Sequence, residues 1–111
     1  MNSYLARLID RATDNNLDLE NNQIGNYRVT PQHGALLNVY HIYKDNCRAI
    51  NNPNSRKVNN AHVATINIDF HCVDIKVNAD YLTVKEIENI IDCINNLYSN
   101  HIINTKNICS T

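Results

Sequence analysis

Histidines and carboxylates near the middle of the chain are the residues best suited to chemistry in this sequence. Asp69 and His71 stand two positions apart in a segment of alternating apolar and polar residues, so on a β-strand they would share one face. His41, on another predicted strand, would lie beside them if the two strands pair. Nitrogen and oxygen ligands of this kind can hold zinc. No pair of them has the short spacing of a dedicated site, so we expect polar groups on a solvated or partner-facing sheet, with no metal and no cofactor.

Other catalytic and ligand-binding arrangements lack essential residues. Cys72 directly follows His71, but neighbouring residues of a strand point to opposite faces, so the imidazole would not activate the thiol. The segment 14–20 opens like a calcium loop, yet Leu19 and Gly25 stand where that loop needs a glycine and a bidentate carboxylate. With only two glycines in the chain, no glycine-rich phosphate loop can form. We therefore expect a protein that is not an enzyme.

Length and composition narrow the class further. A chain of 111 residues with 43% hydrophobic and 19% charged residues is typical of one globular domain. Ten Lys and Arg stand against eleven Asp and Glu, a formal net charge of −1. A chain that depends on neutralising phosphates usually has a large basic excess, so nucleic acid is not the expected partner.

Targeting signals and cysteine spacing indicate the compartment. No apolar run is long enough for a signal-peptide core or a membrane span, so we expect a cytoplasmic protein with no membrane contact. The four cysteines, Cys47, Cys72, Cys93 and Cys109, include no C-x-x-C pair. In a reducing cytoplasm we expect them to be free thiols.

Two stretches have the apolar spacing of amphipathic helices, at about residues 3–14 and 83–99. The second begins with a capping box, in which the side chains of Thr83 and Glu86 would each satisfy the other residue's backbone amide. Leu82 and Ile87 occupy the two positions of a hydrophobic staple. The predicted core-facing stripe consists of Val84, Ile87, Ile90, Ile91, Ile94, Leu97 and Tyr98.

Strands and connections are predicted between these helices. Loose alternation over residues 15–30 indicates two short strands joined at Asn21-Asn22, and a proline within residues 30–34 indicates a turn. Residues 36–43 carry apolar side chains on both faces, as in a central strand that is covered on both sides. Residues 44–60 have few apolar anchors and are predicted to be a long, flexible loop.

The segment 61–77 changes the parity of its alternation at Cys72. Such a change requires either a bulge in one bent strand or a turn between two strands. We favour the bent strand, because no glycine, proline or asparagine marks a turn there. Residues 101–111 lack periodicity and are predicted to be a tail.

These elements predict a small, single α+β domain over residues 1–100. Its curved antiparallel sheet would have four or five strands, with the N-terminal and C-terminal helices packed on one face. The opposite face would be at least partly open.

Charges and tyrosines indicate how such a domain could bind a partner. The loop carries a charge of about +3 and the last helix with its approach about −3, which could steer a charged partner. Tyr40 and Tyr43, beside His41, are candidate aromatic anchors. The full candidate set is Tyr40, His41, Tyr43, Arg48, Arg56, Lys57, Asp69, His71, Asp74, Glu86, Glu88 and Asp92.

The expected function is protein binding through the open sheet face, the loop, or both. Small domains of this kind are typical of immunity proteins that neutralise a cognate toxin by occluding its active site. A nuclease toxin has a basic cleft, which the acidic residues Asp69, Asp74, Glu86, Glu88 and Asp92 would suit.

The alternatives come from other classes of protein. They are a phage-encoded inhibitor of a host defence protein, a secretion chaperone that forms a homodimer, a nucleic-acid module, and a metal-dependent enzyme. The nucleic-acid module would use Arg48, Arg56 and Lys57, whereas the enzyme would need His41, Asp69 and His71 to converge.

Overall fold

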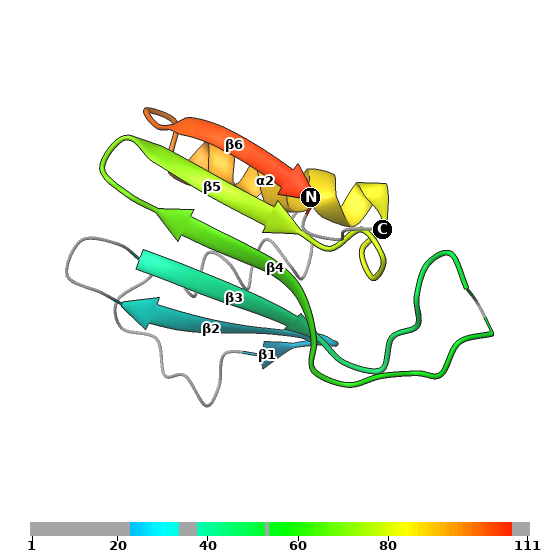
Figure 1. The fold of residues 1–111 in the computed structure, drawn as a ribbon. Coiled ribbons are helices and arrows are strands. Elements are labelled where there is room, and N and C mark those ends of the chain that lie inside the picture. The colour runs from blue at the N-terminus through cyan, green and yellow to red at the C-terminus, as the bar shows by residue number, and fades with distance from the viewer. Residues whose placement is uncertain (1–22, 34–37, 53, 108–111) are drawn as a thin grey trace.

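A computed structural model of the chain describes residues 23–33, 38–52 and 54–107. In these ranges the chain forms one sheet with a helix packed on it (Figure 1). The strands are β1 (Gln23–Ile24), β2 (Tyr27–His33), β3 (Asn38–Lys44), β4 (Ala61–Ile68), β5 (Cys72–Val77) and β6 (Ile102–Asn107), and the helix is α2 (Val84–Leu97). The strands lie side by side in chain order, all antiparallel except β5 and β6, which are parallel.

The predicted helix-plus-sheet class is confirmed, and β3 is a central strand as the sequence indicates. The sheet differs from the prediction in its last strand. Residues 102–107, which the sequence assigns to a tail, form β6, and β6 is parallel to β5 because the chain crosses over through α2 between them. The predicted helix over residues 3–14 lies outside the described residues.

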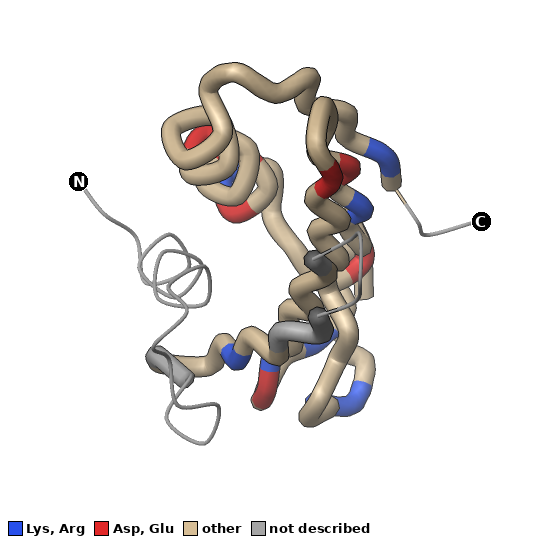
Figure 2. Tube along the Cα trace, turned by 90° about the vertical axis from the view of Figure 1, so that its left-hand side faces the viewer, with Lys and Arg blue, Asp and Glu red and all other residues tan. Residues whose placement is uncertain are grey.

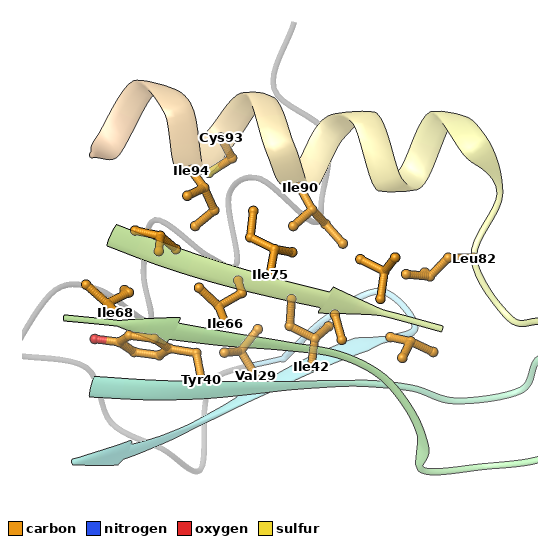
Figure 3. Packing of buried hydrophobic residues seen from close by; sticks show 14 residues of the cluster. Val29, Tyr40, Ile42, Ile66, Ile68, Ile75, Leu82, Ile90, Cys93 and Ile94 are labelled. Carbon is orange, nitrogen blue, oxygen red and sulfur yellow. The ribbon is translucent and has the colours of Figure 1, made fainter. Parts of the chain in front are cut away.

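The core lies between α2 and one face of the sheet (Figure 3). Ile90 and Ile94 of α2 are fully buried, and they pack in one cluster with Ile66 of β4 and Ile75 of β5. The whole cluster consists of Val29, Tyr40, Ile42, Val63, Ala64, Ile66, Ile68, Val73, Ile75, Val77, Leu82, Ile90, Cys93 and Ile94.

The helix α2 begins where the sequence predicts. The hydroxyl oxygen of Thr83 accepts a hydrogen bond from the amide of Glu86 at 3.2 Å, and the Glu86 carboxylate accepts one from the amide of Thr83 at 3.0 Å. Leu82 is buried and Ile87 packs against the same core, as the predicted staple requires. The capping box and the staple are therefore confirmed.

The buried stripe of α2 is narrower than predicted. Val84 is 73% exposed and Leu97 is 39% exposed, although both were expected to face the core. The buried helix residues are Ile90, Cys93 and Ile94. Ile87, Ile91 and Tyr98 are partly buried and pack against the same core, so Val84 and Leu97 are the two members of the predicted stripe that face solvent.

Residues 61–77 form a hairpin, so the favoured prediction of one bent strand is wrong. The parity changes because four residues separate Ile68 from Val73, the last pair of the antiparallel ladder. The carboxylate of Asp69 accepts hydrogen bonds from the amides of His71 at 2.9 Å and Cys72 at 2.8 Å. None of these residues has a positive φ. The turn therefore needs no glycine or asparagine, and the aspartate was the overlooked signal.

The turns near the start of the sheet also differ from the prediction. β2 continues through Pro31 to His33, so residues 30–33 are strand and not turn. Proline is tolerated near a sheet edge, and β1 pairs with β2 only at Tyr27 and Arg28. The observed β1–β2 turn contains Gly25, whose φ of 60° fits the first central position of a type II′ turn. The predicted turn at Asn21-Asn22 lies outside the described residues.

Truncation of a core side chain on α2 tests this packing. Ile90→Ala should lower the free energy of unfolding by about 2–5 kcal/mol, because removing most of a buried isoleucine leaves a cavity. Val84→Ala on the same helix should change it by less than about 0.5 kcal/mol, because Val84 is exposed. Urea unfolding followed by circular dichroism measures both. Equal losses in the two variants would contradict the placement of the helix.

Two substitutions at Asp69 test the hairpin turn. Asp69→Ala should lower the midpoint of thermal unfolding, because two turn amides lose their acceptor. Asp69→Asn should keep most of the stability, because its side-chain carbonyl can accept the same hydrogen bonds. If the two variants melt at the same temperature, the side chain does not hold the turn.

Candidate functional site

α2 leaves one face of the sheet accessible. The helix lies behind the strands in Figure 1, and the side view of Figure 2 shows no described helix or strand over the opposite face. We call this opposite side the open face. Its described side chains come from alternate positions of β2 to β6, and they are Arg28, Thr30, Val39, His41, Tyr43, His62, Thr65, Asn67, Cys72, Asp74, Lys76, Ile102, Asn104 and Lys106.

A β-bulge shapes the middle of the open face. The register between β3 and β4 shifts between Ile42 and Tyr43, so that Val63 is an extra residue in β4. Val63 is fully buried on the helix side. His62 and Thr65 therefore share the open face although they are three positions apart, which a regular strand would not allow.

Three rings gather at this bulge. The centre of the His62 ring lies 5.2 Å from that of Tyr43 and 5.2 Å from that of His41. Nδ1 of His41 is 3.3 Å from Nε2 of His62, and the same Nε2 is 2.8 Å from the hydroxyl oxygen of Thr65. Desolvation, and then the neighbouring His41, lower the pKa of His62 below its ordinary value.

A cation from β2 extends the ring cluster. The guanidinium carbon of Arg28 lies 5.2 Å from the centre of the Tyr43 ring, within the range of a cation–π interaction. Arg28 also donates a hydrogen bond to the side-chain oxygen of Asn60. Its charge is thus held over the rings while the side chain stays half-exposed.

Exposed apolar side chains lie at and beside the β4–β5 turn. Phe70, in the β4–β5 turn, is 74% exposed, and Ile102, at the start of β6, is 67% exposed. The amide of Ile102 donates to the carbonyl of His71 at 2.9 Å, so the turn and β6 are adjacent. The sequence pattern counts Phe70 among the inward positions of a strand, but the turn leaves it facing solvent.

The open face is basic. Lys76 and Lys106 are neighbours across β5 and β6, and both are exposed. With Arg28 they stand against Asp74, whose carboxylate accepts a hydrogen bond from the side-chain amide of Asn104 at 3.2 Å. The strands of the open face therefore present more positive than negative charge.

Residues 45–52 and 54–60, in the predicted loop, form an arm that projects past the ends of β3 and β4 (Figure 1) and contains one isolated β-bridge. Cys47 and Val58 exchange backbone hydrogen bonds of 3.1 and 2.8 Å. The amide of Ile50 donates to the carbonyl of Asp80 at 2.6 Å, which ties the arm to the segment before α2.

The arm adds three exposed cations to the basic surface. Arg48 follows one partner of the Cys47–Val58 bridge and Lys57 precedes the other, with Arg56 next to Lys57. These predicted partner-binding residues are therefore close together along the arm. The acidic residue of the arm, Asp45, accepts a hydrogen bond from the amide of Asn60 at its base.

Glu86, one of the acidic candidates, belongs to a structural network in which its side chain is 16% exposed. Its carboxylate accepts hydrogen bonds from the hydroxyl of Tyr27 and from the ammonium group of Lys44, the latter at 3.0 Å. Burial opposes the ionisation of Glu86, but the Thr83 amide, Tyr27 and Lys44 together hold its pKa below the usual value. The ion pair also neutralises one positive charge of the predicted loop, Lys44, and one negative charge of the last helix, Glu86.

The remaining acidic candidates do not form one surface. The Asp69 carboxylate accepts hydrogen bonds within its turn, and Asp74 lies on the open face. Glu88 and Asp92 are exposed on α2, on the other side of the sheet, where Figure 2 shows acidic positions on the helix. An acidic plug made of these residues together is therefore not present.

The candidate aromatic anchors do not share one surface, and neither do the three residues that the alternative metal site would need. Tyr40 is 4% exposed and lies in the core, whereas His41 and Tyr43 lie on the open face. His41 is in the middle of the sheet, but Asp69 and His71 belong to the β4–β5 turn. Within the described ranges, no three His, Cys, Asp or Glu side chains are grouped as a metal site.

The described cysteines, Cys47, Cys72 and Cys93, are free thiols. Cys93 is part of the core, as expected for a small apolar side chain. The thiol of Cys72 is only half-buried and donates a hydrogen bond to the Asp69 carboxylate at 3.2 Å. This bond raises the pKa of the thiol, so Cys72 is poorly suited to act as a nucleophile.

Sequence reasoning missed Phe70 in the β4–β5 turn and several residues of the open face, namely Arg28, His62, Thr65, Lys76, Ile102 and Lys106. His62 belongs beside His41 only because of the strand register and the bulge, and no local pattern shows either. The alternation in β5 was the available signal for Lys76, because it places that residue opposite the buried Ile75 and Val77.

No protein-family model matches the chain, and no curated protein or solved structure matches it either. In the described part of the chain, no helix is long and apolar enough to cross a membrane. The function is therefore argued from the open face and the arm.

Glu86→Gln tests the network that joins α2 to the sheet. Because the pKa of Glu86 is lowered in the folded protein, its carboxylate stabilises the fold above the unfolded-state pKa, and this contribution is lost as pH falls through the folded-state pKa. We expect wild-type stability to fall more steeply than that of E86Q between about pH 5 and pH 3, and E86Q to cost about 1 kcal/mol at pH 7.

The exposed residue Glu88 on the same helix provides the control. E88Q should reproduce the wild-type dependence of unfolding free energy on pH, measured by urea denaturation. Parallel profiles for E86Q and the wild type would show that Glu86 does not contribute this stability.

Proposed function

We propose that this chain is a non-enzymatic protein-binding protein, and that its open face and arm hold the acidic surface of a cognate protein. The observation that carries the proposal is the composition of one accessible face. Ile102 is exposed at one end of it, next to the turn that carries the exposed Phe70, and cations with aromatic rings lie at the other end.

The apolar end supports a protein partner. Exposed apolar and aromatic side chains such as Phe70 and Ile102 supply the central contacts of protein interfaces. At the other end, Arg28 stacked on Tyr43 combines the two residue types most enriched at such contacts. A surface that binds only a polyanion would not need the exposed apolar pair.

The charges support an acidic partner surface. The open face contributes Arg28, Lys76 and Lys106, and the arm contributes Arg48, Arg56 and Lys57. The acidic groups among them, Asp74 and Asp45, already accept hydrogen bonds within the chain. Complementary charge of this kind speeds encounter and selects the partner.

Neutralisation of a cognate toxin by occlusion of its active site is the specific role that we propose within this class. The acidic candidates are distributed over the turn, the open face and α2. An interface in which acidic residues of this chain enter the basic cleft of a nuclease therefore has less support than one in which its cations bind an acidic surface of the toxin. A phage-encoded inhibitor of a host defence protein would use the same face.

A second candidate function is the binding of single-stranded nucleic acid. The rings of His41, Tyr43 and His62 lie on an accessible sheet face, where they could stack on bases while the nearby cations contact phosphates. Salt distinguishes the two functions, because affinity for nucleic acid falls steeply with rising salt.

Capture of the partner from lysate of the native strain, with wild-type and variant chains, tests the proposal. The wild type should retain one stoichiometric protein through a high-salt wash. Tyr43→Ala and Arg28→Glu should each weaken that complex by about tenfold or more, because both side chains are anchors on the open face. Glu88→Ala, on the opposite side, should leave it unchanged.

Two results would contradict the proposal. Loss of binding in Glu88→Ala with retention in the other variants would assign the interface to α2. Recovery of nucleic acid that dissociates in high salt would favour the second candidate function.

A further inference from the structure

His41 and His62 present ring nitrogens to each other on the open face. Nδ1 of His41 and Nε2 of His62 are 3.3 Å apart, and the hydroxyl oxygen of Thr65 is 2.8 Å from the latter. His41 is half-exposed and His62 is exposed, so a small ion can reach both from solvent. The bulge in β4 produces this arrangement, because it turns His62 and Thr65 to the same face.

The spacing of the two nitrogens fits two ligands of one metal ion. Zinc–nitrogen bonds measure about 2.0–2.1 Å, so two nitrogens of a tetrahedral zinc site are about 3.3–3.4 Å apart. The observed 3.3 Å falls at this value. In the chain without metal the two nitrogens are also close enough for a hydrogen bond between the rings, which a bound ion would replace.

The chemistry of the two rings also suits a transition-metal ion. An imidazole must be neutral to bind a metal ion. Imidazole nitrogen suits zinc, copper and nickel ions better than calcium or magnesium.

We propose that His41 and His62 form an open site for a divalent transition-metal ion such as Zn²⁺, bound through Nδ1 of His41 and Nε2 of His62. Water fills the other positions, and the ion displaces the 2.8 Å contact between the Thr65 hydroxyl and Nε2 of His62. The site replaces the combination of His41 with Asp69 and His71, which the β4–β5 hairpin separates, and it departs from the expectation that the chain binds no metal. It does not rest on the proposed function, because the metal binds to the chain alone.

A titration with zinc chloride tests the site on the full chain without a histidine tag. Long-range ¹H–¹⁵N spectra resolve the two nitrogens of each histidine ring. We expect Nδ1 of His41 and Nε2 of His62 to shift together with one dissociation constant, while the other three histidines keep their shifts. Binding should weaken at least about tenfold in His41→Gln and in His62→Gln, because each removes one of two protein ligands.

His71→Gln is the matched control, since it removes an exposed histidine outside the pair, and its affinity should stay within about twofold of the wild type. The amide spectrum reports whether each variant is folded, and the ring shifts of the wild type provide the test without any variant. A thiolate charge-transfer band on titration with Co²⁺ would instead assign the ion to a cysteine. That result, shifts at the opposite ring nitrogens, or no shift up to millimolar zinc would overturn the proposal.

Discussion

The structure depends on the burial of the apolar side of α2 against one face of the sheet. Ile90 and Ile94 are fully buried there with Ile66 and Ile75, in the cluster that joins helix and strands. Because α2 connects β5 to β6, the same packing aligns β6 parallel to β5 and completes the described edge of the sheet. A helix on one side also leaves the other side accessible, and the polar and aromatic residues of alternate strand positions occupy it.

The net charge of the chain is near zero, but its acidic and basic residues are concentrated on different sides of the sheet. Acidic Glu88 and Asp92 are exposed with the helix, whereas the open face and the arm carry most of the described exposed cations (Figure 2). Where the two sides meet, Lys44 and Glu86 form an ion pair that also satisfies Tyr27. A nearly neutral chain can therefore present a basic surface to one partner while its helix side repels the same partner.

Local signals in the sequence predicted the features that residues close in sequence determine, such as the start of α2. Thr83 with Glu86, and Leu82 with Ile87, mark the start of α2 within a few residues, so the helix was predictable. The candidate site was predictable only in part, because His41 and Tyr43 gain their neighbours from other strands. The bulge at Val63 sets the place of His62, and its cause is the register between β3 and β4, which local periodicity does not contain.

The parallel position of β6 has a consequence for the order in which the chain can fold. β2 to β5 pair antiparallel with strands adjacent in sequence, so these contacts can form while the protein is being synthesised. β6 has to wait until α2 has formed and crossed the sheet, because a parallel partner cannot be reached through a short turn. Until residues 102–107 have left the ribosome, the outer edge of β5 is exposed as a template for pairing with another chain. Once β6 pairs, it covers the apolar strand β5, and its own largely exposed side chains, Lys106 among them, then line the described edge of the sheet.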